Sequence, residues 1–178
     1  MINEKVKEIM KIMSNIQYGF KDKEGNNLFL NQEKWNKDFS FFYYLQTPEE
    51  LLETKCGICW DQVELERKLF FNSQIINKTY FIFTHIDGIL PSHTFLIYCN
   101  DNKYYWFEHS WSQYIGIHEY DSELKLLQDV ANKFRKKYCK LKQNTVLYLY
   151  EYQAPKKHIK CNEFYKYIES QNKIEIDL

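Results

Sequence analysis

Apolar residues recur at helical spacing near the start of the chain. Between residues 2 and 16, charged residues alternate with one apolar stripe, formed by Ile2, Val6, Ile9, Met10 and Met13. This spacing predicts a peripheral amphipathic helix. The following segment at 22–27 has the composition of a turn, and the aromatic stretch at 29–46 has no clear period.

A second helix is predicted by its start signal. Thr47 is a favourable N-cap, Pro48 suits the first helical position, and Glu50 can close a capping box with Thr47. We expect this helix to end near Lys55, because Gly57 follows.

Helical spacing returns at Cys59. The apolar positions that follow it are Val63, Leu65, Leu69 and Phe70. The solvent side of this helix is expected to hold Asp61, Glu64, Glu66, Arg67 and Lys68. Acidic residues come first and basic residues later, as the helix dipole favours.

The period then shortens to that of strands. Three β-rich runs cover residues 79–86, 92–99 and 103–111, and the compact turn Asn100-Asp101-Asn102 should join the last two as an antiparallel hairpin. The pattern continues with a helix at 122–138, a strand at 145–152 and a short helix at 161–170. This order predicts an α+β fold in one domain over residues 1–178, with helices outside an antiparallel sheet.

Composition and charge narrow the function classes. The chain has 24 basic and 24 acidic residues and a pI near 6.9, so we expect neither nucleic acid nor a membrane surface as partner. Five cysteines are too few, and odd in number, for a disulfide scaffold of 178 residues. The N-terminus lacks the apolar core of a signal peptide, and no later stretch reaches transmembrane length, so a cytoplasmic setting is expected.

The stretch KCGICWDQ contains Cys56 and Cys59 at the spacing of a zinc half-site or a redox pair. The remaining cysteines, Cys99, Cys139 and Cys161, form no second close pair. A thioredoxin-like site would follow a strand, whereas a helix is predicted before Cys56. No calcium-binding loop motif is present either, so we expect no cofactor and no metal. Cys56 is then either a bystander or a resolving thiol.

Cys59 has the setting of a nucleophile. A helix N-terminus favours a thiolate and offers N–H groups to an oxyanion. His93 begins a predicted strand and Glu108 lies late in the strand paired with it, so both should lie at the open end of the hairpin. An imidazole and a carboxylate at that position can form a triad with Cys59.

These residues resemble the transglutaminase-like superfamily of papain-like thiol enzymes. Gly57-Ile58-Cys59-Trp60-Asp61 is similar to the nucleophile motif of that family, residues 92–98 to its histidine strand, and residues 102–111 to its acid strand. The resemblance covers roughly residues 50–120. It implies a papain-like or transglutaminase-like core, in which a nucleophile helix packs on an antiparallel sheet with additional peripheral helices. The acid of the family is usually aspartate, whereas this chain has Glu108.

A second alignment remains open for the orienting residue. The segment CGICW also resembles CGSCW of papain, and His109-Ser110-Trp111 is similar to the Asn-Ser-Trp that orients the papain histidine. His109 would then replace Glu108 as the third group. In papain-like enzymes the catalytic histidine lies about 130–150 residues after the cysteine, and the late histidine here is His158. The short spacing favours Glu108.

Less specific interpretations apply to each residue. Cys59 can be an inert core thiol, His93 structural and Glu108 a surface carboxylate. Trp60 and Trp111 are expected in the core. Gln62 should lie on the solvated helix face, unless it helps to bind an oxyanion.

The sequence as a whole favours a thiol hydrolase: a peptidase, amidase or deamidase acting on a peptide or protein substrate. Cys59 would form an acyl-enzyme, His93 would act as base and then acid, and Glu108 would orient His93. The alternatives are a transglutaminase-type acyltransferase and a non-catalytic binding domain of the same fold. Oligomeric state is left open.

Overall fold

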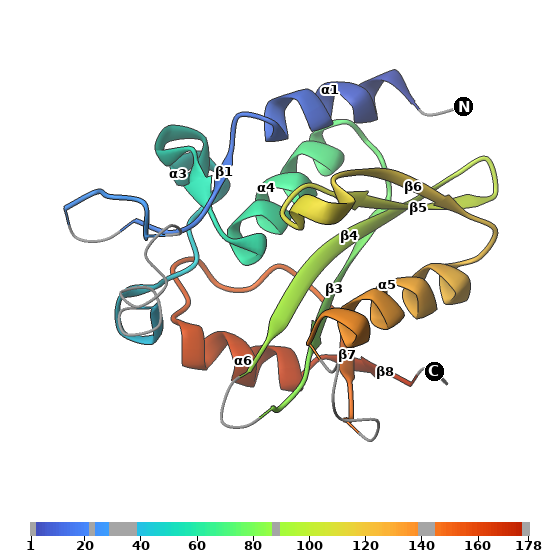
Figure 1. Cartoon of the computed structure of the whole chain (residues 1–178). Coiled ribbons are helices and arrows are strands. Elements are labelled where there is room, and N and C mark those ends of the chain that lie inside the picture. The colour runs from blue at the N-terminus through green and yellow to red at the C-terminus, as the bar shows by residue number, and fades with distance from the viewer. Residues whose placement is uncertain (1–2, 22–23, 29–38, 87–89, 139–144, 176–178) are drawn as a thin grey trace.

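The computed structural model describes residues 3–21, 24–28, 39–86, 90–138 and 145–175, and its centre is a six-stranded antiparallel sheet (Figure 1). In chain order the strands are β3 (Asn77–Phe83), β4 (Ser92–Asn100), β5 (Lys103–Glu108), β6 (Gly116–Tyr120), β7 (Tyr148–Tyr152) and β8 (Asn172–Ile174). They lie side by side in the order β6-β5-β4-β3-β7-β8. The predicted α+β class is confirmed.

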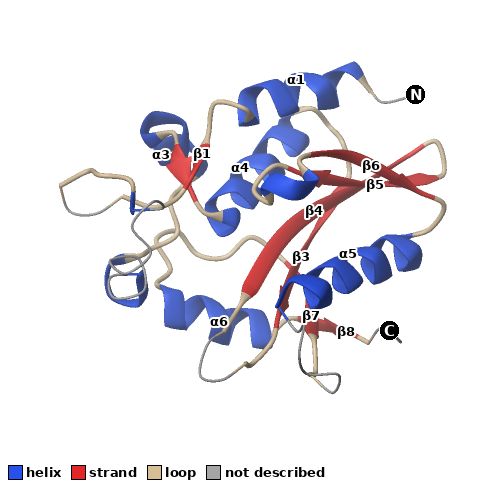
Figure 2. Ribbon diagram, in the orientation of Figure 1, coloured by secondary structure: helices blue, strands red, loops and turns tan. Residues whose placement is uncertain are grey.

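Helices cover both faces of this sheet, as Figure 2 shows. They are α1 (Glu4–Met13), α3 (Pro48–Thr54), α4 (Cys59–Asn72), α5 (Glu123–Tyr138) and α6 (Cys161–Glu169). Successive side chains of β4 point to opposite faces of the sheet, as strand geometry requires. Phe95 and Ile97 pack in the cluster of α5, whereas Leu96 and Tyr98 pack with side chains of α1 and α4.

The hairpin that carries the candidate histidine and acid forms as predicted. Strands β4 and β5 pair in antiparallel register, with Leu96 opposite Phe107. The turn uses left-handed backbone at Asp101 and Asn102, a conformation that these residue types tolerate better than most. β5 is shorter than predicted and ends at Glu108. The reason is local, because the backbone N–H of Trp111 folds back to bind the Glu108 carboxylate at 2.7 Å.

The helix before the nucleophile segment also follows its start signal. The Thr47 N–H donates to Glu50 Oε2 at 2.8 Å, and the Glu50 N–H donates to Thr47 Oγ1 at 3.3 Å. This completes the predicted capping box. Lys55 ends the helix in the left-handed conformation with φ of 51°, close to the predicted end.

The sequence pattern fails on the polar side of α4. Asp61, Glu64 and Glu66 were expected in solvent but are buried. The physical reason is the central position of α4, which contacts α1 and α3 as well as strands β3 and β4. A single sequence pattern cannot separate a solvated polar face from one that other elements cover.

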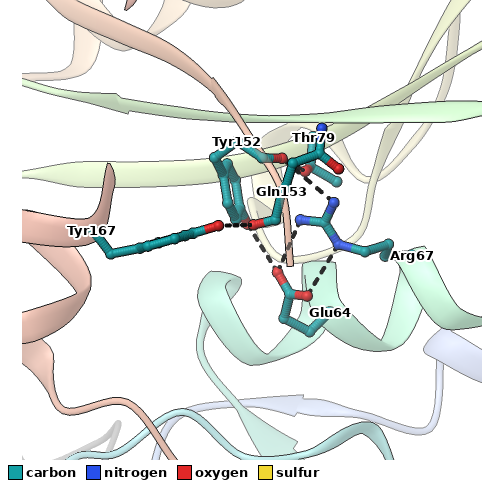
Figure 3. Close-up of polar contacts among 6 residues, drawn as sticks. All are labelled: Glu64, Arg67, Thr79, Tyr152, Gln153 and Tyr167. Atoms are coloured by element: carbon teal, nitrogen blue, oxygen red, sulfur yellow. Dashed lines mark hydrogen bonds and ion pairs between the residues drawn. The ribbon is translucent and has the colours of Figure 1, made fainter. Parts of the chain in front are cut away.

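The buried charge of Glu64 is compensated by a local network (Figure 3). Arg67 donates to both Glu64 oxygens, through Nε at 3.0 Å and Nη2 at 3.1 Å. The Tyr152 hydroxyl donates to Glu64 Oε1 at 3.2 Å, and the Arg67 guanidinium lies 5.0 Å from the Tyr152 ring centroid. The network ties α4 to β7, and the Tyr167 hydroxyl extends the contacts to α6 by donating to the Gln153 carbonyl at 3.0 Å.

The sequence pattern did not predict the short strands. β1 (Gln17–Tyr18) pairs in parallel with β2 (Cys56–Gly57), and the edge strands β6 and β8 were not predicted either. Strands of two to five residues with mixed polarity carry no clear period. Across the described part of the chain, no helix is long and apolar enough to cross a membrane.

Candidate active site

Cys59 is the first residue of α4. The residue before it, Ile58, is the N-cap and has no side-chain oxygen that could accept hydrogen bonds from the first turn. The N–H groups of that turn and the positive end of the helix dipole therefore lie near Cys59 without a side-chain cap from Ile58. This is the setting in which a thiolate and an oxyanion are both favoured.

His93 and Glu108 lie against each other at the open end of the hairpin. The distance from His93 Nε2 to Glu108 Oε2 is 2.8 Å, and both residues are buried, with exposed fractions of 6% and 2%. Glu108 Oε1 accepts from the Trp111 N–H at 2.7 Å and from Ser110 Oγ at 3.0 Å. Both oxygens of the carboxylate are thus hydrogen-bonded. The alternative interpretation of Glu108 as a surface carboxylate is wrong.

The second nitrogen of His93 is left for Cys59. The Cys59 side chain lies close enough to His93 to raise the pKa of the imidazole, as Glu108 also does. Because Nε2 is engaged with Glu108, Nδ1 is the ring nitrogen that remains for an interaction with Cys59. The structure therefore brings the three predicted residues together in the order thiol, imidazole, carboxylate.

Burial and charge act in opposite directions on this pair. Burial alone would lower the pKa of His93, but the charge of Glu108 and the hydrogen bonds to Cys59 and Glu108 outweigh it and raise that pKa to about 9. Burial would raise the pKa of Glu108, but the charge and hydrogen bond of His93 hold it below the usual value. An imidazolium paired with a carboxylate is the form that follows.

Trp111 covers the imidazole. Its ring is buried and meets the His93 ring edge-on at a centroid distance of 4.9 Å. Phe95 lies on another side of His93, at 6.1 Å and nearly parallel. These rings keep water from the His93–Glu108 hydrogen bond, which strengthens the interaction. Trp60 is buried among aromatic side chains, so both tryptophans lie in the core as predicted.

The alternative third group, His109, points elsewhere. Its Nδ1 lies 2.8 Å from Gln62 Oε1, and Gln62 Nε2 donates to the Gly57 carbonyl at 2.9 Å. Burial lowers the pKa of His109 against the opposing effect of Glu108. Gln62 is 1% exposed, so its predicted place on a solvated face is wrong. His158 lies apart from this cluster, in an exposed contact with Glu50.

Tyr18 is a residue of the site that the sequence did not indicate. Its strand β1 pairs with β2, so that Tyr18 lies opposite Gly57, and its hydroxyl lies close enough to Cys59 for the two side chains to interact. Burial, together with the nearby Cys59, raises the pKa of Tyr18 well above its ordinary value, and the hydroxyl keeps its proton. Cys59 itself is only 4% exposed. No local pattern links positions 18 and 59.

Cys56 differs from its neighbour in the CxxC stretch. It is buried in β2, and burial raises the pKa of its thiol to about 11. Among the described residues, no group of three or more His, Cys, Asp or Glu side chains could hold a metal ion. Cys139, one of the possible zinc ligands, lies outside the described residues.

A family model for a transglutaminase-like domain matches residues 2–133. The match reaches well beyond the segment at 50–120 and includes α1 and β1 as well as the hairpin. No curated protein matches the chain.

Proposed function

Because the chain belongs to the transglutaminase-like domain family, we propose that it is a thiol enzyme acting on an amide or peptide carbonyl group. Cys59 is the nucleophile, His93 the general base and acid, and Glu108 the group that orients His93. The observation that carries this proposal is the buried 2.8 Å contact between His93 and Glu108, next to a cysteine at a helix N-terminus. A peptide or protein is the proposed substrate.

The geometry supports a two-step reaction. The imidazolium of His93 places a positive charge beside the sulfur, which favours the thiolate. The thiolate attacks the carbonyl carbon, and the N–H groups at the start of α4 stabilise the oxyanion. His93 Nδ1–H then gives its proton to the leaving amine as the C–N bond breaks, and a thioester remains on Cys59.

The second step decides the type of product. His93 Nδ1 now accepts a proton from an incoming nucleophile, which attacks the thioester and releases the Cys59 thiolate. With water as nucleophile the enzyme is a peptidase, amidase or deamidase, and with an amine it is an acyltransferase. We place hydrolysis first because it needs no second substrate.

The proposal is tested by the pH dependence of thiol alkylation. An unactivated thiol loses reactivity with iodoacetamide about tenfold for each pH unit below its pKa, because only the thiolate reacts. We expect Cys59 to lose much less than the exposed Cys99 between pH 8 and pH 6, as measured by mass spectrometry of labelled peptides. Comparing each residue with itself at two pH values removes the effect of different exposure.

Two variants complete this test. His93→Ala should make the pH dependence of Cys59 as steep as that of Cys99, whereas the exposed His85→Ala should change nothing. If the alkylation rates of Cys59 and Cys99 in the unmodified protein fell equally steeply with decreasing pH, the thiol-enzyme proposal would be excluded. A non-catalytic binding domain would then be favoured.

A further inference from the structure

A hydrogen-bonded bridge joins the acid strand to the nucleophile loop, and the proposed reaction makes no use of it. It runs from His109 Nδ1 to Gln62 Oε1, over 2.8 Å, and from Gln62 Nε2 to the Gly57 carbonyl, over 2.9 Å. His109 directly follows Glu108 in the chain, and Gly57 lies two residues before Cys59. The bridge thus spans the two halves of the site.

The chemistry of the bridge allows one arrangement. A carbonyl only accepts, so the nitrogen of the Gln62 amide must face Gly57 and its oxygen must face His109. An oxygen in that position needs a donor, so His109 must carry a hydrogen on Nδ1. Each group therefore fixes the orientation of the next.

The loop at the end of the bridge is closely constrained. Gly57 O also accepts from the Gly19 N–H at 3.3 Å, and the Ile58 N–H donates to Asp61 Oδ2 at 2.9 Å. A Cβ at Gly57 would lie 2.6 Å from Leu51 Cδ1, so the loop has little room to shift. The peptide between Gly57 and Ile58 is therefore held by two residues of the first turns of α4, Asp61 and Gln62.

We propose that Gln62 and His109 are positioning residues, which fix the Cys59 sulfur relative to the His93–Glu108 pair. The sulfur belongs to α4, while the imidazole and the carboxylate belong to the β4–β5 hairpin. Side-chain packing between a helix and a sheet leaves some freedom of sliding, and a shift of 1 Å at reacting atoms can cost about a hundredfold in rate. The bridge restrains that sliding. This inference rests on the proposed function.

The test compares paired variants at each position. His109→Phe and Gln62→Met keep the approximate size of the side chains and remove the bridge. His109→Asn retains an N–H donor near the position of Nδ1. We expect the first two variants to slow Cys59 alkylation at pH 6 by about tenfold or more, and His109→Asn to recover most of that loss.

A control separates positioning from stability. Thr79→Val removes the hydrogen bond from Thr79 Oγ1 to the Tyr152 carbonyl, which is 2.8 Å long and buried away from the site. It should lower the melting temperature without changing the pH profile of Cys59. If His109→Phe and Gln62→Met behave like Thr79→Val, the residues are structural and the inference is wrong.

The outcomes also separate this inference from the proposed function. An activated Cys59 in the unmodified protein, with unchanged profiles in both bridge variants, overturns the inference alone. A Cys59 that is not activated in the unmodified protein overturns both. Should the variants fail to fold, the ¹⁵N chemical shift of His109 Nδ1 in the unmodified protein decides, because the bridge requires a protonated Nδ1 and an unprotonated one contradicts it.

Discussion

Glu108 is one methylene group longer than an aspartate, and the structure shows how the longer side chain is accommodated. Oε2 reaches His93, while Oε1 turns to the Trp111 N–H and to Ser110. The chain turns back immediately after β5, and the additional methylene lets the carboxylate contact both His93 and this turn. The carboxylate is therefore fixed from its own loop as well as from the imidazole.

Glu108→Gln should remove the charge that sustains the His93 imidazolium. The pKa of His93, about 9 in the unmodified protein, should fall, because burial then acts without an opposing charge. We expect alkylation of Cys59 at pH 6 to slow by about tenfold or more, with NMR titration of His93 as the direct measurement. Glu108→Asp restores the charge and should recover part of the rate. A His93 pKa that does not change in Glu108→Gln would contradict this account.

At single residues, the sequence predicted the groups that local motifs mark. Cys59 follows Gly57 and precedes a helical pattern, and His93 and Glu108 flank a recognisable hairpin turn. Tyr18 had no such mark, since its contact with Cys59 depends on two-residue strands that are far apart in the chain. Gln62 was misplaced because only the packed structure shows what covers that side of α4.

Among the elements, α4 departs furthest from the prediction. Its apolar positions correctly predicted a helix, and its acidic residues were wrongly placed in solvent. The strands β3, β4, β5 and β7 were found because each is rich in aromatic or β-branched residues. Edge strands of three to five residues with mixed polarity, such as β6 and β8, were missed for lack of a period.

Glu64→Gln should destabilise the junction between α4 and β7. The substitution leaves the largely buried guanidinium of Arg67 without its charged partner, and we expect a loss of about 1–3 kcal/mol in the free energy of unfolding. Urea denaturation measures this loss. The double variant Glu64→Met with Arg67→Met should be more stable than Glu64→Gln, because no charge is left unpaired.

The control for this prediction is an exposed ion pair that joins α4 to α3. Lys68 pairs with Glu49, and both side chains are largely exposed to solvent. Glu49→Gln should cost less than about 1 kcal/mol. If Glu49→Gln and Glu64→Gln had equal effects, burial of the Glu64 network would have no energetic importance.

For the molecule as a whole, the buried acid Glu66 and the site histidine His93 affect the pH dependence of stability in the same direction. His93 binds its proton more tightly in the folded state, so its contribution is complete below about 6.5 and is lost as the pH rises through about 9. Burial also raises the pKa of Glu66 well above 4.5, and Glu66 Oε2 has no hydrogen-bond partner among the described residues. Its contribution is likewise lost as the pH rises.

We therefore expect the melting temperature to decrease from pH 6 to pH 9. Glu66→Gln should reduce this decrease and raise the melting temperature at pH 8. A neutral amide then replaces a buried carboxyl group that ionises in the unfolded state but is kept protonated by burial in the folded state. The exposed Glu53→Gln should leave the pH dependence unchanged. Differential scanning calorimetry across this range measures both, and a melting temperature that rises toward pH 9 would contradict the prediction.

The parallel pairing of β1 with β2 also bears on the order of events during folding. It brings Gln17 to Cys56 and so closes a loop of roughly 40 residues, whereas the β4–β5 hairpin closes over a tight turn. Contacts that are local in sequence form faster than distant ones. The imidazole–carboxylate pair should thus assemble early and the Tyr18 cover over the sulfur late. A newly made chain passes through an interval in which its nucleophile is open to oxidants, so its recovery in active form should depend on reducing conditions during refolding.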